Sequence, residues 1–390
     1  MKIFHFVLLL CWVNISYGQT KSVIVNYQHN VDTIRENYTQ SGKSYRSIVL
    51  SKNQIEIHNS STLEIMERFA LTHEFANENL LDLRFRNIEQ LEFTSNSEIG
   101  ITEVDLSNNP IKTFPEGLNK FNSLQVLKFT NNKFSYLSED ISELRELRIL
   151  ELGNVPVKAL PGSFSGLKKL EKLVISYLSI EDKSHFFEIL SKLPNLRELE
   201  LWSLGSEKQF PDSFFKLARL EKLYLSGGDF DLSQVFQKKS IKDLTLRLID
   251  LDTLHDGISQ MRDLHSLKII GSAEIESVSP KLAKLKKLKT LAIDYGWGGT
   301  YHVMDHNELY KTIAKLKRLE CLQLGDYFEE MYPFYKNKRL KYFAGNGRSK
   351  NITEKELSRV KQEIEVDVKG CYQWDDFNPK IKCTGTIRCN

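Results

Sequence analysis

The sequence predicts an α/β solenoid, in which a short strand and a helical return alternate many times around one continuous core. Three observations predict it. An apolar skeleton of about 23 residues recurs along most of the chain, two apolar positions in each copy alternate with polar residues, and another apolar residue stands three positions before most copies. Alternation indicates a half-buried strand, whereas a spacing of three or four residues indicates one face of a helix. Each copy therefore supplies one strand and one helical return.

The clearest copy covers residues 101–122, with apolar residues at positions 1, 4 and 6 (Ile101, Val104 and Leu106) and then the pair Phe114-Pro115 before a helical tail. The skeleton restarts at Leu124, Leu147, Leu170, Leu196, Leu220, Ile241, Leu264, Leu288 and Leu319, at spacings of 23, 23, 23, 26, 24, 21, 23, 24 and 31 residues. A copy buries five or six large apolar side chains, each stabilising by roughly 1.5–3 kcal/mol. Ordering costs about 1.5 kcal/mol per residue, so single copies cannot fold and stacked copies can.

These residues resemble the leucine-rich-repeat (LRR) family in its form of 23–24 residues. The stretch Leu147-Arg-Ile-Leu150-Glu-Leu152, followed by Leu160-Pro161 and a helical turn, matches that family's consensus nearly position for position. The resemblance covers about residues 80–350. It implies a horseshoe with a parallel sheet on the concave side and helices or 3₁₀ turns on the convex side.

The family places an asparagine at position 9, where its amide satisfies backbone groups of the loop after the strand. In this sequence Asn109 and Asn132 occupy that position. The later copies have other residues there: Val155, Leu178, Leu204, Gly228, Ile249 and Ser272. We therefore expect the later loops to satisfy their backbone in another way and to be less regular.

Four segments are predicted along the chain. Residues 1–18 read as a signal peptide, with a basic start at Lys2, an apolar run and small residues before Gln19. Residues 19–79 are predicted to be an N-terminal cap that contains a degenerate repeat at residues 45–53. Residues 80–350 form the repeat array, and residues 351–390 are predicted to be a C-terminal cap with a strand near residues 364–368 and a cysteine-containing tail.

Charge and hydropathy exclude some partners. One of the 54 Lys and Arg residues lies in residues 1–18, so 53 basic side chains remain against 51 acidic ones. Such a balance argues against a nucleic-acid partner. After residue 18 no apolar run is long enough to span a bilayer. The expectation is an exported protein without a membrane span, either secreted, periplasmic or at the cell surface.

No motif for catalysis or for a cofactor is present. Gly162-Ser-Phe-Ser-Gly166 has the wrong spacing for a nucleophile elbow, and there is no Walker loop, His-Glu-x-x-His or Cys-x-x-Cys. His302, Asp305 and His306 have the spacing of one helical face, but two histidines and a carboxylate in an exposed loop are more often plain polar residues. The sequence predicts neither an enzyme nor a cofactor, and no metal site.

The concave face is read from positions 3, 5, 7 and 8 of each copy. Its N-terminal end is charged, with Asp82, Arg84, Arg86, Glu103, Asp105 and Lys128. The later copies carry apolar and aromatic residues and one arginine, residue types enriched at interface hot spots. The partner-binding candidates are Val174, Tyr177, Trp202, Tyr224, Arg247, Ile270 and Tyr295, with Trp297 from the adjacent glycine-rich insertion. The alternative is that these side chains stack across strands and only stabilise the sheet.

Cysteines and lysines give two further expectations. Among the four cysteines after residue 18, we expect one disulfide between two of Cys371, Cys383 and Cys389, and a free Cys321. The lysine-rich run at residues 281–289 is expected on the convex side as a solvated face, the alternative being contact with an anionic surface.

The sequence thus favours an exported module that binds a protein through its concave face, in recognition or adhesion. Binding of a glycan or of the cell wall through concave aromatic residues is the second hypothesis, and an envelope scaffold without a specific ligand is the third. The partner's identity and the oligomeric state stay open.

Overall fold

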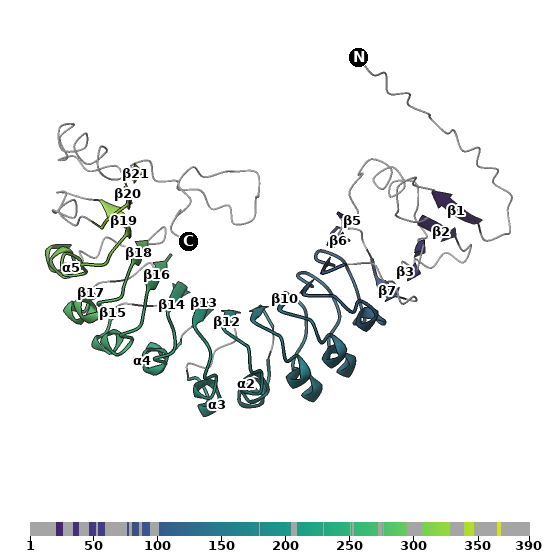
Figure 1. The fold of residues 1–390 in the computed structure, drawn as a ribbon, viewed down its shortest axis with the longest axis horizontal. Helices are drawn as coiled ribbons and strands as arrows, with labels where there is room; N and C mark the ends of the chain where they lie inside the picture. The colour runs from purple at the N-terminus through teal and green to yellow at the C-terminus, as the bar shows by residue number, and fades with distance from the viewer. Residues whose placement is uncertain are drawn as a thin grey trace, which may run out of the picture.

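The computed structural model is an arc of stacked repeats, with strands along its inner side (Figure 1). It describes most of the array: residues 101–178, 180–203, 209–228, 230–249, 251, 253–271, 275, 277–294, 306–327 and 339–346. Outside the array it describes residues 21–25, 34–38, 47–51, 54–58, 76–77, 80–85, 88–93 and 365–367.

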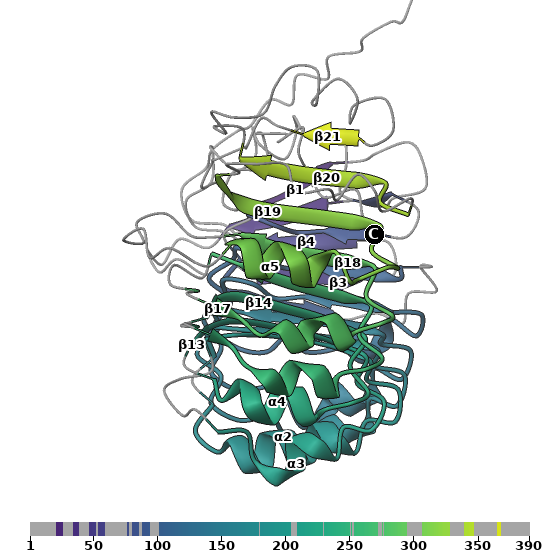
Figure 2. The ribbon, with the colours of Figure 1, turned by 90° about the vertical axis from the view of Figure 1, so that its left-hand side faces the viewer.

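One long sheet lines the concave side of the arc (Figure 2). It has 14 strands, and every neighbouring pair in it is parallel except β5 with β6. In the order of the sheet, the strands are β5 (Ala76–Asn77), β6 (Leu80–Asp82), β8 (Glu103–Asp105), β9 (Val126–Lys128), β10 (Ile149–Gly153), β11 (Lys172–Ser176), β12 (Glu198–Trp202), β13 (Lys222–Gly228), β14 (Asp243–Ile249), β16 (Ser266–Ile270), β18 (Thr290–Asp294), β19 (Cys321–Tyr327), β20 (Tyr342–Asn346) and β21 (Glu365–Asp367).

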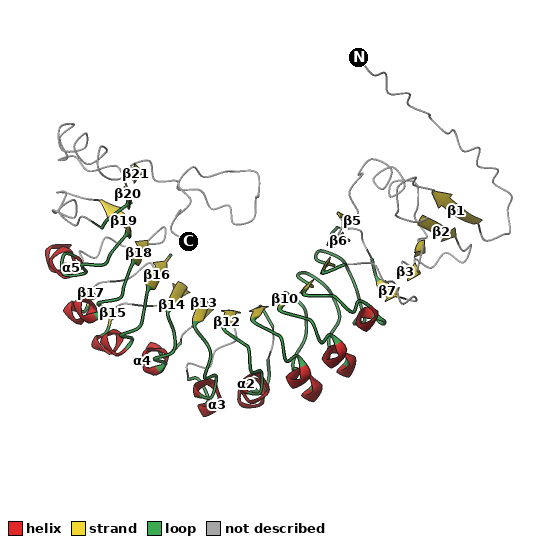
Figure 3. Ribbon diagram, viewed as in Figure 1, coloured by secondary structure: helices red, strands yellow, loops and turns green. Residues whose placement is uncertain are grey.

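Short helices return the chain along the convex side (Figure 3). Nine of them lie within the described residues. Five are 3₁₀ helices: η1 (Leu118–Lys120), η2 (Glu139–Glu143), η3 (Gly162–Gly166), η4 (Asp256–Gln260) and η5 (Pro280–Lys284). Four are α-helices: α2 (Lys183–Ser191), α3 (Asp212–Phe215), α4 (Leu232–Gln237) and α5 (His306–Ile313). Beside η4 and η5, β15 (Thr253–Leu254) pairs in parallel with β17 (Ser277–Val278).

The core confirms the predicted register. Leu150 and Leu152, at positions 4 and 6 of their copy, are fully buried, and Leu150 pairs with Leu173, the same position of the next copy. The predicted return-helix positions also face the core: Leu144 and Leu167 are buried. Because each strand and helix contributes to one continuous core, each repeat is stabilised mainly by its two neighbours.

A separate five-stranded sheet lies at the N-terminal end. Its order is β1 (Lys21–Val25), β2 (Ile34–Tyr38), β4 (Gln54–His58), β3 (Ser47–Ser51) and β7 (Gln90–Phe93). The segment expected to open a degenerate repeat is β3. It pairs antiparallel with β4 as a hairpin, instead of leading into a return helix. Alternating residues predicted the strand correctly, but they do not distinguish a hairpin from a repeat.

At the other end, the predicted strand near residues 364–368 is confirmed as β21, which pairs in parallel with β20. The predicted signal peptide and the cysteine tail lie outside the described residues. The proposed boundaries of both caps stay predictions. Within the part of the chain that the structure describes, no helix is long and apolar enough to cross a membrane.

Candidate binding face

A left-handed residue stands near the end of the strand in nine consecutive repeats, at position 8. In chain order these residues, with their φ angles, are Phe85 (57°), Asn108 (60°), Asn131 (58°), Asn154 (48°), Tyr177 (53°), Ser203 (51°), Gly227 (60°), Leu248 (48°) and Gly271 (69°). The left-handed region costs most residues about 1–2 kcal/mol, while glycine adopts it freely and asparagine tolerates it. The turn that ends each strand therefore selects for asparagine or glycine, and any other residue there needs a reason.

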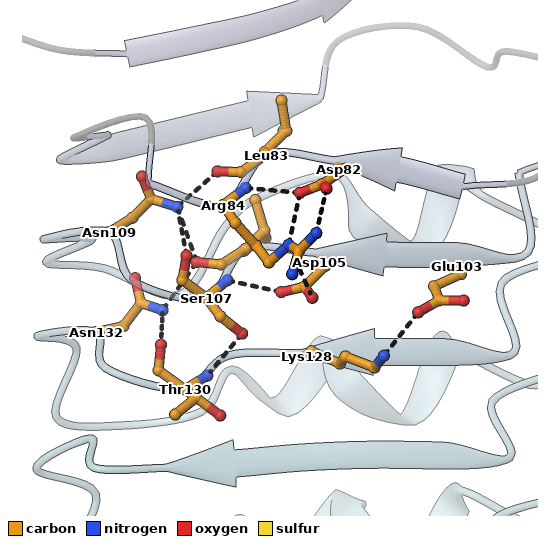
Figure 4. A network of polar contacts seen from close by, with 11 residues as sticks. Asp82, Leu83, Arg84, Glu103, Asp105, Ser107, Asn109, Lys128, Thr130 and Asn132 are labelled. Carbon is orange, nitrogen blue, oxygen red and sulfur yellow. Dashed lines mark hydrogen bonds and ion pairs between the residues drawn. The ribbon is translucent and has the colours of Figure 1, made fainter. Parts of the chain in front are cut away.

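In the first repeats, asparagines hold this turn together (Figure 4). The side-chain amide of Asn109 donates to the carbonyl oxygens of Leu83 (2.8 Å) and Leu106 (2.9 Å), and its oxygen accepts from the backbone N–H of Ile88 (3.1 Å). Asn132 makes the same pattern of bonds one repeat later. Both side chains are buried, so they satisfy backbone groups that water does not reach.

A second row of asparagines lies beside the first, at the left-handed position itself. The amide of Asn131 donates to the side-chain oxygen of Asn108 (2.7 Å), and the amide of Asn154 donates to that of Asn131 (2.8 Å). This row ends at Tyr177, where the side chain changes from amide to aromatic.

The later repeats replace the buried asparagine with apolar residues, and their strands are longer. Val155, Leu178 and Ile249 at position 9 are all buried. The strands grow from three residues in β8 and β9 to seven in β13 and β14, where Gly228 pairs with Ile249 across the sheet. Backbone pairing between strands thus takes over part of what the asparagine amides do. The expected loss of regularity does not reach the left-handed turn, which persists through Gly271.

Ion pairs cover the concave face from β8 to β12. Lys128 contacts Glu103 (2.8 Å), and Lys172 contacts both Glu198 (2.7 Å) and Glu200 (2.5 Å). Burial raises the pKa of Glu151, which stands between the two lysines, and their positive charges oppose that rise. Side chains that already form ion pairs with each other contribute little energy to the binding of a partner.

Asp82 and Asp105 extend this charged surface towards the N-terminus. Arg84 binds the carboxylate of Asp82 (2.6 Å) and lies 3.6 Å from that of Asp105 (Figure 4). The predicted charged end of the face is therefore confirmed for these three residues, while Arg86 lies outside the described residues.

An aromatic cluster occupies the centre of the concave face. The rings of Trp202 and Tyr224 are stacked, with centroids 5.0 Å apart and planes at 21°. The guanidinium of Arg247 reaches across Ser226 and lies 5.4 Å from the Trp202 ring. Burial raises the pKa of the Tyr224 hydroxyl, and a hydrogen bond from Arg247 opposes the rise. The structure thus brings together three of the residues that the sequence predicted.

The other predicted binding residues are distributed around this cluster. Tyr177 stands at the end of the preceding strand, its N–H bonded to the Trp202 carbonyl (2.9 Å), and its side chain is 56% exposed. Val174 pairs with Glu200, next to Tyr224, and Ile270 pairs with Arg247. Tyr295 and Trp297 lie outside the described residues.

Leu248 belongs to this surface and was missed by the sequence analysis. It is left-handed, 49% exposed, and its Cδ2 lies over Gly271, where an added Cβ would come within 2.8 Å of it. Its signal in the sequence is an apolar residue at position 8, where neighbouring copies have asparagine, serine or glycine. Phe85 and Tyr177 are the other exposed large hydrophobic residues at this position among those described.

One cysteine expectation is wrong. Cys321 is buried and disulfide-bonded instead of free. It is the one cysteine among the described residues, so its partner lies outside them, as do Cys371, Cys383 and Cys389. The predicted disulfide within the tail stays a prediction.

The repeat is also found by comparison with known proteins. Residues 103–252 match the family described as leucine-rich repeat region. A search of curated proteins finds no match.

Several solved structures are similar to this chain. One is an LRR protein of Leptospira interrogans, with 17% identity over 77% of this chain and 98% of that one, and a TM-score of 0.41. Another is the internalin inlF of Listeria monocytogenes, with 16% identity over 69% and 87%, and a TM-score of 0.46. A third is TLR13 in its complex with ssRNA13, with 18% identity over 72% and 50%, and a TM-score of 0.47. At these identities and TM-scores, the similarities carry no functional argument.

The family match and the geometry agree on the same residues. Within residues 103–252 the strands follow a single register, each is followed by a left-handed turn, and buried asparagines bind that turn in the first copies. Residues 103–252 of this chain are therefore a leucine-rich-repeat region.

Proposed function

We propose that this chain is a protein-binding module whose partner contacts the concave aromatic cluster. The cluster consists of Trp202, Tyr224 and Arg247, with Tyr177 and Leu248 beside it. The observation that carries the proposal is the exposure of Tyr177 and Leu248 in a backbone conformation that penalises both residues.

A purely structural role accounts for the stacked rings but not for these two residues. Asparagine or glycine at the same position, as in Asn154 and Gly227, gives the same turn without the penalty. Tyr177 and Leu248 expose about half of their surface, so burial recovers little of that cost. Strained residues of this kind are concentrated at functional sites, where the strain places a side chain for a ligand.

The dimensions fit a protein interface. Neighbouring strands lie about 4.8 Å apart, so the repeats from Tyr177 to Leu248 span roughly 15 Å. That is the width of the centre of an interface burying about 800 Å² on each partner. Tryptophan, tyrosine and arginine are the residues that contribute most to such centres.

The arrangement of the rings argues against the glycan hypothesis. Sugars bind aromatic residues through the open face of a ring. Tyr224 and Arg247 both lie against the Trp202 ring, which reduces the face left for a sugar. The indole N–H of Trp202 is also buried, and it has no hydrogen-bond acceptor among the described residues. Protein binding is therefore the better-supported function, while export and adhesion stay predictions.

The test compares two double variants on the same concave face. Replacing Trp202→Ala with Tyr224→Ala should weaken binding to a true partner by at least about 2 kcal/mol, or roughly thirtyfold. The matched control replaces Glu103→Gln with Lys128→Gln, which removes an ion pair in the first half of the array without changing the net charge. Partners are captured on the immobilised native chain, and each one's affinity for the three proteins is measured by surface plasmon resonance.

Circular dichroism and urea unfolding establish that both variants are folded. If a partner binds the aromatic variant with native affinity and the control variant more weakly, the binding site lies in the first half of the array and the proposal is wrong. Unfolding of the aromatic variant would mean that the rings serve the sheet alone.

A further inference from the structure

The turns that lead into the strands line one edge of the arc, because all the repeat strands are parallel. We define the strand-entry edge as the two residues before and the one residue after position 1, in the copies that begin at Leu147 through Leu319 and at Leu340. Its basic residues are Arg145, Arg148, Lys168, Lys169, Arg197, Arg219, Lys239, Lys242, Arg262, Lys286, Lys287, Lys289, Lys317, Arg318, Arg339 and Lys341. Its acidic residues are Glu146, Glu171, Glu221, Asp263 and Glu320.

The strand-entry edge is far more positive than the rest of the chain. Its 16 basic and 5 acidic described residues give it a net charge of +11, whereas the whole chain has +3. The remainder of the molecule therefore carries an excess of negative charge. Three lysines of the run expected on the convex side, Lys286, Lys287 and Lys289, belong to this edge, and Lys281 and Lys284 belong to η5.

Exposure increases this imbalance at the surface. All 16 basic side chains are exposed, while every acidic one except Asp263 is half-buried. Several acids are already neutralised from the neighbouring repeat, such as Glu146 by Lys169 (2.6 Å) and Glu221 by Lys242 (2.8 Å). The hydrogen bond from Lys242 and the nearby charges of Arg197 and Lys222 lower the pKa of Glu221.

Many of these basic side chains have no polar partner among the described residues. Six of them form neither a side-chain hydrogen bond nor an ion pair with any described residue: Arg145, Arg197, Lys239, Arg262, Lys317 and Arg318. They occur from the turn before β10 to the turn before β19, so unpaired positive charge recurs over most of the edge.

A hollow of about 370 Å³ lies in the middle of the strand-entry edge. Four bases line it together with two acids: Arg197, Arg219, Lys239 and Lys242, with Glu221 and Asp263. Ser240 also lines it, and its buried hydroxyl has no hydrogen-bond partner among the described residues. The hollow thus combines a net positive charge with an unused hydroxyl group.

The shape and chemistry of this edge select one class of polyanion. The residues that define it include no phenylalanine, tyrosine or tryptophan, so they lack the stacking platforms that single-stranded nucleic acids use and the anchors of a protein interface. The charges recur over eight strand spacings, about 40 Å. A hollow fits a chain with projecting groups better than it fits a flat membrane.

We propose that the strand-entry edge binds a linear anionic polysaccharide, whose sugar rings advance by about one strand spacing and carry carboxylate or sulfate groups. Charge-assisted hydrogen bonds from the exposed Arg and Lys side chains hold those groups. This site is separate from the concave aromatic cluster and faces a different side of the repeat.

The experiment uses the full chain and two fluorescent probes, a heparin oligosaccharide and an oligogalacturonate, each long enough to span the edge. Fluorescence anisotropy should show binding that weakens steeply with salt, because the bases release counterions from the polyanion. The variant with Arg197→Gln, Arg219→Gln and Lys239→Gln should bind at least one probe about tenfold more weakly. The matched control with Lys284→Gln, Lys311→Gln and Lys315→Gln removes the same charge from the convex side and should lose less than about twofold.

Equal losses in the two triple variants would overturn the proposal, because attraction by net charge alone would then explain the binding. So would tighter binding of a single-stranded oligonucleotide of equal charge, or of vesicles containing phosphatidylserine, or no binding of either oligosaccharide. The variant with Trp202→Ala and Tyr224→Ala should keep the native affinity for the probes, so the polysaccharide site and the protein site can fail independently.

Discussion

Both halves of the array have a left-handed turn near the end of each repeat strand, but different groups stabilise that turn in the two halves. In residues 101–154 asparagines occupy positions 8 and 9, and the strands β8 and β9 are three residues long. In residues 170–271 the residues at these positions are aromatic, aliphatic, serine or glycine, and strands of up to seven residues supply more of the backbone bonds. Once the backbone no longer needs an amide there, position 8 is free to present side chains such as Tyr177 and Leu248 to a partner.

The largest expected effect is the loss of a buried asparagine in the first half. Asn109→Leu leaves the N–H of Ile88 and the carbonyl of Leu83 without their side-chain partner, while the carbonyl of Leu106 keeps its bond from Asn132. Unsatisfied buried groups cost about 1–3 kcal/mol each, so we expect the free energy of unfolding to fall by about 3 kcal/mol. Urea unfolding followed by circular dichroism measures it.

The reciprocal change in the next copies sharpens the comparison. Val155→Asn extends the asparagine row by one repeat, next to Asn154, whose side chain already belongs to the neighbouring row. The new amide gains bonds but loses the apolar burial of Val155, and we expect a net change within about 1 kcal/mol. Equal destabilisation by Asn109→Leu and Val155→Asn would break the distinction between the two halves.

A second contrast concerns a buried charge in each half. Asp105 accepts a hydrogen bond from the N–H of Ser107 (3.0 Å) and lies near Arg84. Among the described residues, Lys238 has only the carbonyl of Phe215 (2.8 Å) and the Phe214 ring as partners. Burial lowers the pKa of Lys238 from 10.5 to about 8. Between these two values the unfolded chain binds a proton that the native chain has lost, so native stability rises with pH in that range.

Urea unfolding at pH 7 and pH 10 should therefore show a gain of up to about 3 kcal/mol from Lys238, on top of the other groups. Lys238→Met removes this gain, so the difference in stability between variant and native chain should shrink as the pH rises. A difference that is constant with pH would mean that the ammonium group is solvated in the native state.

The variant with the smallest expected effect on stability, Leu248→Gly, distinguishes a role in folding from a role in binding. Leu248→Gly relieves the left-handed strain and should stabilise the chain by up to about 1 kcal/mol. Asn131→Gly, at the same position in the first half, loses the side-chain hydrogen bonds with Asn108 and Asn154 and should destabilise the chain by about 1 kcal/mol. If Leu248 serves a partner, the more stable variant binds that partner more weakly. Destabilisation by Leu248→Gly would show that its contact over Gly271 matters more than its strain.

The repeat period explains what the sequence predicted well. A fixed period places position 4 of one copy beside position 4 of the next, so the burial of Leu150 and the meeting of Trp202, Tyr224 and Arg247 followed from spacing alone. Leu248 was missed because a leucine in the sequence does not predict a left-handed backbone, and it is this backbone conformation that makes the exposed leucine costly. The basic edge was likewise assigned to the convex side, since the run at residues 281–289 crosses from η5 into the turn before β18.

Other errors came from contacts distant in sequence. The state of Cys321 depends on where another cysteine lies, and spacing does not determine disulfide pairing. The strand β3 was recognised, but its antiparallel partner β4 was not, because the same alternation suits a hairpin and a repeat.

The central claim is that the second half of the array binds a protein through side chains that its left-handed turns expose. Photo-crosslinking tests it most directly, with the photoreactive residue p-benzoylphenylalanine placed either at Tyr177 or at Asn108, the same position of the repeat in the first half. Irradiation with a captured partner should give a covalent adduct from position 177 and none from position 108. An adduct from position 108 alone, or equal yields from both positions, would contradict the claim.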